Sequence, residues 1–400
     1  MISKKVLLIL FITLSISLFS QTKDAKYSFY GFIRNDFYFN SRQNVESSDG
    51  LFNLFPKPIS LNSSNENLNA SPQAEMLSIN SRLGIDIKGT PILGASSSAK
   101  LEADFAGFST SFYVFRIRQA YVCLNWKNTE LLVGQTWSPM FGNVNPTTPS
   151  INNGAPFQPF NRSPQIRFKQ YLSETTTFTT AALYQMQYAS QGPLGCSNSY
   201  LKNALLPDFF VGLENKAGNW TSGLGAEMKT IKPLIGEITS GSALIYTQYQ
   251  TNTFQLKAKA IYGQNLSDEQ MLGGYGISGT DTYTNFNTAS SWLNLVYGNK
   301  YQLGIFLGMA QNFGTNQALM ADNSGKYTFY GYGTYIDTQI LCNRIYRIAP
   351  HVSYNLPNLK FSVEYNFTAA TYGNLQNNGT VIQPYTVNNH RAVATIFYYF

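Results

Sequence analysis

The chain has 400 residues, of which 44% are hydrophobic and only 12% are charged, about half the usual charged share. A formal net charge of +7 is too small an excess to indicate nucleic-acid binding, so no nucleic acid is expected as a partner. The three cysteines, Cys123, Cys196 and Cys342, have no paired spacing, which argues against a disulfide framework and against zinc. No cofactor, metal or phosphate-binding motif is found, and none is expected.

The N-terminus predicts export. Lys4 and Lys5 precede an apolar run over residues 6–19, and small or polar residues follow, which is the pattern of a cleaved secretory signal peptide. We therefore expect a signal peptide over 1–20 and a single barrel domain over 21–400, whose formal net charge falls to +5. No later window approaches 18 apolar residues, which excludes a helical membrane protein.

Alternation with a period of two residues then dominates the chain. The first strand is expected over Tyr27–Asn40 and is followed by a polar stretch from Ser41 to Ala74 and a strand near Leu77–Gly89. In the strand near Leu77–Gly89, residues 82, 86 and 88 are charged and the residues between them are mostly apolar. The charged side chains therefore lie on one face of this strand. Runs of about ten such residues are typical of a transmembrane β-barrel.

The connections alternate between short and long, as barrel connections do. Short turns are expected near residues 90–96, 127–129, 217–219, 298–299 and 355–358. Longer loops are expected over Ser138–Ser163, Ala189–Pro207, Asn265–Ala289, Asn312–Asn343 and Tyr372–Thr386. The count predicts an all-β fold: an antiparallel barrel of about 16 strands with long extracellular loops.

The chain ends on an aromatic strand, Arg391–Phe400, that stops at the last residue. Sheet edges are not tolerated in lipid, so this strand is expected to close the barrel against Tyr27–Asn40. The terminal Phe400 also resembles the signal by which the barrel assembly machinery recognises outer-membrane proteins. These features predict a bacterial outer-membrane location with membrane lipid around the barrel.

Three blocks of sequence resemble the DcaP-like porin family: RIRQAYVCLNW at 116–126, ELLVGQTWSPMF at 130–141 and GAPFQPFNRSPQIRF at 154–168, preceded by RLGIDIKG at 82–89. Together they cover about a fifth of the chain. The resemblance implies a 16-stranded barrel, commonly a homotrimer, that passes small anionic solutes such as dicarboxylates. Some members of the family carry an N-terminal coiled coil before the barrel, whereas only about six residues separate the expected signal peptide from the first strand here, which argues against a trimer driven by a coiled coil.

The segment Ser138–Ser163 contains five of the 16 prolines, at positions 139, 146, 149, 156 and 159. Proline fixes the backbone and removes hydrogen-bond donors, so this segment is stiff and is not a strand. Its length and rigidity predict a constriction loop that folds into the pore, with an ordinary exposed loop as the alternative.

Cationic side chains cluster beside this loop and on polar strand faces. A charge facing lipid at mid-bilayer costs roughly 2–4 kcal/mol, so these residues are expected to line the lumen. The pore-lining or constriction candidates are Arg82, Lys88, Arg116, Arg118, Arg162, Arg167, Lys169, Lys257 and Lys259. They favour anions, unless Asp86, Glu102, Asp104 and Glu130 neutralise them in ion pairs.

The expected function is therefore passive diffusion of small hydrophilic solutes, with a preference for anions and without enzymatic activity. Two alternatives stay open. His351 and Ser353 share one strand face, as in outer-membrane phospholipases, which gives one possible barrel enzyme. The other alternative is a secreted β-rich adhesin, because alternation alone does not show which face of a sheet is wet.

Overall fold

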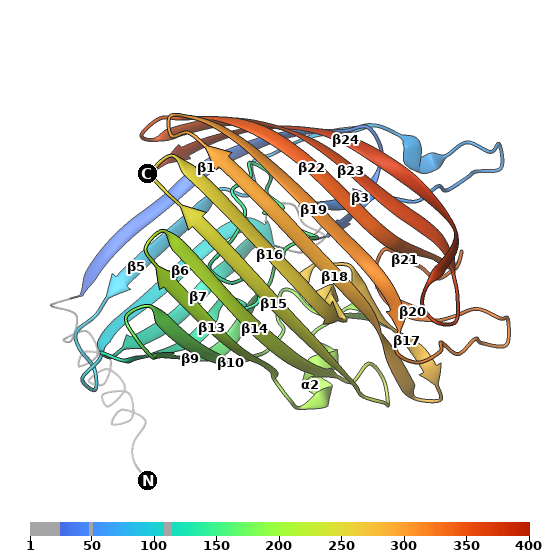
Figure 1. Cartoon of the computed structure of the whole chain (residues 1–400), viewed down its shortest axis with the longest axis horizontal. Helices are drawn as coiled ribbons and strands as arrows, with labels where there is room; N and C mark the ends of the chain where they lie inside the picture. The colour runs from blue at the N-terminus through green and yellow to red at the C-terminus, as the bar shows by residue number, and fades with distance from the viewer. Residues whose placement is uncertain (1–24, 48–50, 108–113) are drawn as a thin grey trace, which may run out of the picture.

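The computed structural model describes residues 25–47, 51–107 and 114–400, and within them the chain forms one closed antiparallel β-barrel (Figure 1). The expected signal peptide lies outside the described residues. Among those described, no helix is long and apolar enough to cross a membrane.

Within these described ranges, sixteen strands form the closed ring. In order around the barrel they are β1 (Lys26–Asn40), β5 (Arg82–Lys88), β6 (Ser96–Gly107), β7 (Val114–Asn125), β8 (Thr129–Trp137), β9 (Arg162–Tyr171), β10 (Thr176–Leu183), β13 (Asp208–Ala217), β14 (Trp220–Ile231), β15 (Ile238–Gln250), β16 (Phe254–Gln264), β18 (Thr282–Tyr297), β19 (Tyr301–Thr315), β22 (Ile340–Asn355), β23 (Leu359–Leu375) and β24 (Val381–Tyr399).

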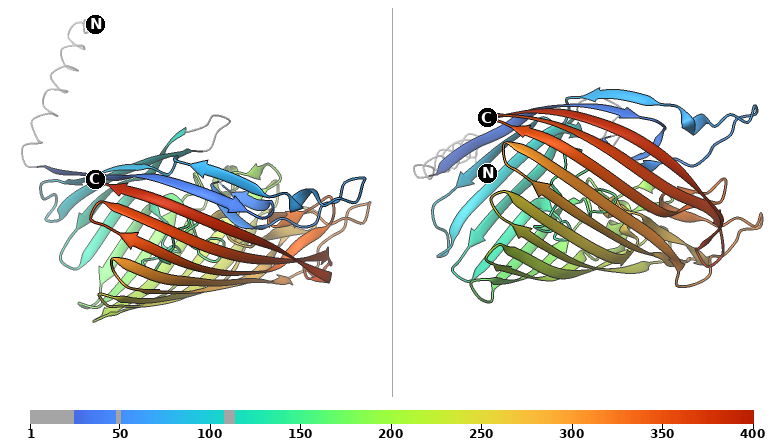
Figure 2. Two further views of the ribbon diagram at one scale, coloured as in Figure 1. Left: turned by 90° about the horizontal axis from the view of Figure 1, so that it is seen from above. Right: turned by 45° about the horizontal axis from the view of Figure 1, so that its top comes forward.

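The remaining elements are short and belong to the connections. They are β2 (Asn44–Ser47), β3 (Phe52–Pro56), η2 (Leu68–Ala70), β4 (Gln73–Leu77), β11 (Gln191–Gly192), β12 (Gly195–Cys196), α2 (Ser199–Ala204), η3 (Leu266–Glu269), β17 (Gly273–Gly279), β20 (Phe329–Tyr332) and β21 (Thr334–Tyr335). Short turns gather at one end of the barrel and long loops at the other (Figures 1 and 2). The expected barrel is confirmed, although β23 and β24 extend into the segment 372–386 that was expected to be a loop.

The first and last strands close the ring, as the aromatic C-terminus predicted. Strand β1 pairs with β24 in antiparallel register from Phe32 opposite Tyr399 to Asn40 opposite Arg391. Two backbone hydrogen bonds between Gly31 and Phe400, of 3.1 and 3.2 Å, continue this pairing to the last residue. No barrel strand is left with an unpaired edge along this seam.

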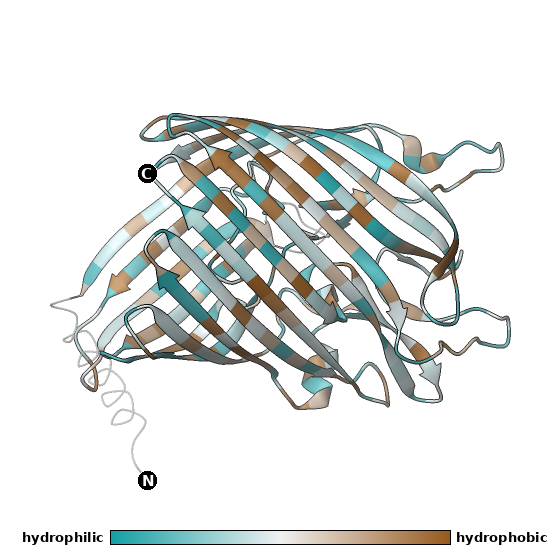
Figure 3. Ribbon diagram, in the orientation of Figure 1, coloured by the Kyte–Doolittle hydropathy of each residue, from teal (hydrophilic) through white to brown (hydrophobic). Residues whose placement is uncertain are grey.

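The strands carry polar side chains inward and apolar side chains outward. On β22, Arg347, His351 and Ser353 are 2–5% exposed inside the barrel, whereas Ile348 and Val352 are about half exposed on its outer surface. The same alternation of hydrophilic and hydrophobic residues runs along the strands in Figure 3. An apolar outer surface around a polar interior is the arrangement of a membrane barrel, and the opposite of a soluble sandwich.

This arrangement predicts the effect of an outward charge. Replacing Ile348 with Arg should destabilise the folded barrel by about 2–4 kcal/mol, because the guanidinium would lie in the hydrocarbon near the middle of a long strand. The free energy of unfolding in lipid vesicles would be measured by urea titration. The matched control, Glu174→Arg in the turn between β9 and β10, should change it by less than about 1 kcal/mol. Equal effects of the two substitutions would contradict the assignment of the lipid-facing surface.

A bulge on β7 aims an extra polar residue into the barrel. Glu102 of β6 pairs with Gln119 and the next residue, Ala103, pairs with Ile117, so Arg118 has no direct partner in the ladder. Arg118 and Gln119 are therefore not on opposite faces, and Arg116 and Arg118 both stay buried in the interior. The bulge explains why the inward polar residues of β7 stand at even-numbered positions up to Arg118 and at odd-numbered positions after it.

Candidate functional site: a constricted lumen

The loop over 138–161 lies inside the barrel and touches several parts of its wall. At its base, the Ser138 backbone N–H donates to the Asn161 carbonyl at 2.9 Å. The Arg34 side chain of β1 donates to the Pro149 carbonyl at 2.8 Å, and that of Arg347 on β22 donates to the Ala155 carbonyl at 2.7 Å. These bonds join the loop to distant strands, so the predicted inward-folded loop is confirmed; we call residues 138–161 the constriction loop.

Aromatic stacking holds the base of the constriction loop. The rings of Trp137 and Phe141 are stacked with centroids 3.9 Å apart, and Phe160 meets Trp137 edge to face at 4.9 Å. Further along, the Trp292 indole N–H donates to the Gln158 side chain at 2.8 Å. Packed rings and five prolines leave this loop one well-defined position across the pore.

A second segment also fills the interior, contrary to the expectation that only one loop folds inward. The stretch from Ser41 to Ala74 was described from the sequence as polar, but its β2–β3 hairpin buries Phe52, Leu54 and Phe55. Phe52 packs on Phe160 of the constriction loop with ring centroids 4.6 Å apart. An apolar cluster inside an otherwise polar stretch was the available signal for this burial.

Arginines from neighbouring strands line one side of the constriction. We call five of them the arginine wall: Arg34, Arg82, Arg116, Arg118 and Arg162. Apart from Arg82, each of these residues has at most 6% of its surface exposed. The first four line a cavity of about 210 Å³ next to the constriction loop.

Carboxylates on β1 and β6 neutralise much of this wall. Asp104 accepts hydrogen bonds from Arg116 at 2.7 and 2.9 Å and from Arg118 at 2.7 Å. Glu102 accepts from Arg118 at 2.8 Å and lies 3.6 Å from Arg82. Among the described residues, three carboxylates, those of Asp36, Glu102 and Asp104, face five guanidinium groups, which leaves a formal excess of two positive charges.

Arg162 has aromatic neighbours in place of a carboxylate. Its guanidinium lies 4.7 Å from the Trp137 ring centroid and donates to the Tyr188 hydroxyl at 2.7 Å. Within the described parts of the chain it forms no ion pair, and two of its nitrogens have no hydrogen-bond partner. Cation–π contacts on several sides stabilise this charge at the base of the constriction loop.

The predicted lysines and Arg167 lie outside the arginine wall. Arg167 and Lys169 line a second cavity, of about 490 Å³, and Lys169 forms a 2.9 Å ion pair with Glu130. Lys257 donates to the Thr147 hydroxyl at 2.9 Å, and Lys259 donates to the Phe141 carbonyl, so both hold the constriction loop. Lys88 is exposed at the short-turn end of β5, paired in register with Lys26, and does not reach the constriction.

Three interior arginines were missed by the sequence prediction: Arg34, Arg347 and Arg391. Arg34 pairs with Asp36 at 2.6 Å, and Arg391 lies 4.1 Å from the centroid of the Tyr38 ring. The alternation of polar and apolar residues could have identified such interior arginines, because Arg34 and Asp36 share one face of the first predicted strand.

The alternative enzymatic pair is not assembled as a nucleophile and base. The Ser353 hydroxyl is hydrogen-bonded to that of Ser362 at 2.8 Å, and among the described residues it has no bond to His351. His351 Nδ1 is buried, and no residue in the described ranges forms a hydrogen bond with it. A catalytic serine needs a base within hydrogen-bond reach, which this geometry does not provide.

The fold is similar to those of solved outer-membrane proteins. The outer membrane channel DcaP of Acinetobacter baumannii is similar with a TM-score of 0.69 and 16% identity, over 94% of this chain and 97% of that one. OmpT of Vibrio cholerae in its trimer form has a TM-score of 0.55 at 10% identity, over 94% and 99%. OmpF of Salmonella typhi, in complex with daunomycin, has 0.55 at 11%, over 94% and 98%. No protein-family model and no curated protein matches the sequence. These likenesses confirm the predicted porin fold.

Proposed function

We propose that this protein is an outer-membrane porin that lets small hydrophilic solutes diffuse passively and favours anions, dicarboxylates among them. The observation that carries the proposal is the constriction loop, which narrows a polar lumen beside a wall with excess positive charge. Similarity to the DcaP channel supports the same function. Arginine offers paired donors to a carboxylate, so a solute with two carboxylates suits this wall.

Swelling of proteoliposomes tests this proposal. Vesicles that contain the folded protein should swell in isosmotic solutions of a small sugar and, faster, of a dicarboxylate such as succinate. Vesicles with the same protein heat-denatured before reconstitution are the control. Absence of swelling in every solute would refute the porin function, whereas equal rates for neutral and anionic solutes of one size would refute only the anion preference.

Arg82 is the wall residue most open to solution, and its replacement tests the preference directly. Its side chain is 23% exposed, compared with 8% or less for Arg34, Arg116 and Arg118. In Arg82→Gln the permeability ratio of chloride to potassium should fall by about twofold, because one lumen cation is lost beside Glu102. The reversal potential in a KCl gradient measures this ratio. Lys88→Gln removes the same charge far from the constriction and should leave the ratio unchanged; equal shifts would contradict the role of the wall.

We also propose a homotrimer, in line with the trimer form of the similar OmpT, assembled in the outer membrane by machinery that recognises Phe400. Cross-linking of the folded protein in detergent should give a band of three chains. Deletion of Phe400 should reduce the folded fraction in cells, because the residue also pairs with Gly31 at the seam.

A further inference from the structure

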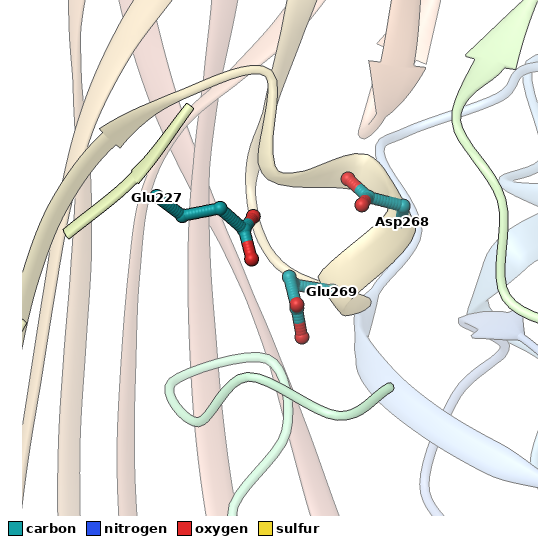
Figure 4. A group of neighbouring side chains, drawn as sticks. All are labelled: Glu227, Asp268 and Glu269. Atoms are coloured by element: carbon teal, nitrogen blue, oxygen red, sulfur yellow. The ribbon is translucent and has the colours of Figure 1, made fainter. Parts of the chain in front are cut away.

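Four buried carboxylates gather behind the base of the constriction loop. Glu227 comes from β14, Asp268 and Glu269 come from η3, and each offers an oxygen within 4.8 Å of the others (Figure 4). The Gln185 side chain links this group to Asp208 of β13, donating to Asp208 at 3.3 Å and to Asp268 at 3.1 Å. We call Asp208, Glu227, Asp268 and Glu269 the acidic cluster.

The acidic cluster has too few positively charged partners to neutralise its carboxylates. Its four residues are 1–7% exposed, and the one cation that pairs with them among the described residues is Lys229, bound to Asp268 and to the Asn265 carbonyl. Ionised, the group carries a formal excess of three negative charges. Burying unpaired carboxylates is costly, so they require either protons or a bound cation.

Oxygen atoms in the cluster are open to a ligand. Glu269 Oε2 and Asp208 Oδ1 are buried and have no hydrogen-bond partner among the residues that the structure describes. No hydrogen bond to the Glu227 carboxylate is found in the described part of the chain, and Figure 4 shows this side chain reaching toward the two residues of η3. The cluster therefore has unsatisfied acceptors that face one another.

We propose that the acidic cluster is a binding site for Ca²⁺, held chiefly by Glu227, Asp268 and Glu269. Calcium takes six to eight oxygen ligands at about 2.3–2.6 Å, so two opposed ligands lie about 5 Å apart, a span that the three carboxylates fit. The donor set is all oxygen, which disfavours zinc and copper. Mg²⁺ requires a tighter octahedron and keeps more of its water, so it should bind more weakly.

The ion would connect the constriction loop to the barrel wall. Both ends of that loop rest on η3: the Ser138 hydroxyl donates to the Glu269 carboxylate at 3.1 Å, and the Phe160 backbone N–H donates to the Glu269 carbonyl at 2.9 Å. The Asn161 side chain donates to the Asp268 carbonyl at 3.2 Å. A Ca²⁺ ion bound between η3 and β14 would fix the position of η3, to which both ends of the constriction loop are hydrogen-bonded.

Calorimetric titration of Ca²⁺ into the folded full chain tests the site, after EDTA treatment and in detergent micelles at neutral pH. We expect one saturable site, with Mg²⁺ binding at least tenfold more weakly. The double variant Glu227→Gln and Glu269→Gln should weaken Ca²⁺ binding at least tenfold. Glu130→Gln, which removes a lumen carboxylate paired with Lys169, should bind Ca²⁺ as the unaltered chain does.

A second measurement separates loss of the site from loss of the fold. Heat-dependent migration on SDS gels shows whether each variant forms the barrel, and Ca²⁺ should raise the melting temperature of the unaltered protein but not that of the double variant. If the double variant does not fold, Glu269→Gln alone takes its place. Absence of saturable binding at millimolar Ca²⁺, or equal affinity in the folded variant, would overturn the site while leaving the proposed pore untouched.

Discussion

Shortening the constriction loop should raise single-channel conductance more than any other change. Ser138 and Asn161 are hydrogen-bonded to each other, so a linker of a few glycines can replace residues 139–160 and join β8 to β9 as a simple hairpin. The loop occupies the interior between β1 and β22, so its removal should widen the lumen there. We expect conductance to increase about twofold or more in a planar bilayer, since conduction follows pore dimensions.

The control for this deletion is an equally artificial change outside the pore. Residues 61–67 form the tip of an exposed extension at the loop end of the barrel (Figure 2), and Leu68 is hydrogen-bonded to Ser60. Replacing 61–67 with two glycines should leave conductance unchanged. If shortening the constriction loop also leaves conductance unchanged while the barrel folds, the pore does not run past this loop.

Replacing Asp104 with Asn should cause the largest loss of stability. The carboxylate is fully buried and holds Arg116 and Arg118 at 2.7–2.9 Å, so its removal leaves two buried guanidinium groups short of a partner. Breaking a buried ion pair in this way costs about 3–5 kcal/mol. The free energy of unfolding in lipid vesicles measures the effect, and the folded fraction should shift chloride selectivity upward.

Two further variants serve as a control and a rescue for this prediction. Glu130→Gln breaks the more exposed pair with Lys169 and should cost less than about 1 kcal/mol. Combining Asp104→Asn with Arg116→Gln should recover part of the lost stability, because one of the two uncompensated charges is removed as well. An Asp104→Asn protein as stable as the Glu130→Gln protein would show that the wall is solvated and that its ion pairs contribute little.

The barrel was predictable because its strands obey a local rule. Alternation, turn residues and an aromatic C-terminus are visible over windows of ten residues, and each follows from lipid outside and water inside. Boundaries were less predictable: ten of the fifteen residues in the segment 372–386 belong to strands, since β23 and β24 project beyond the region in which alternation is enforced. The bulge at Arg118 is one residue long and depends on its partner strand.

The interior of the barrel was harder to predict because it depends on contacts distant in sequence. The hairpin that buries Phe52 is stabilised by Phe160 and by Arg347, residues more than a hundred positions away. Whether Arg116 is free or paired depends on the register that places Asp104 opposite it. The sequence therefore identified most of the cations at the constriction, but not which of them keep a net charge.

Recording of the refolded protein in a planar bilayer across a KCl gradient tests the porin function and the anion preference most directly. We expect stepwise increases in current as channels insert and a reversal potential on the side of chloride, because the described carboxylates leave the arginine wall a formal excess of two positive charges beside the constriction loop. Absence of current steps from a protein that migrates as a folded barrel would contradict the porin function. A firm preference for potassium would contradict the assignment of the arginine wall as the selective element.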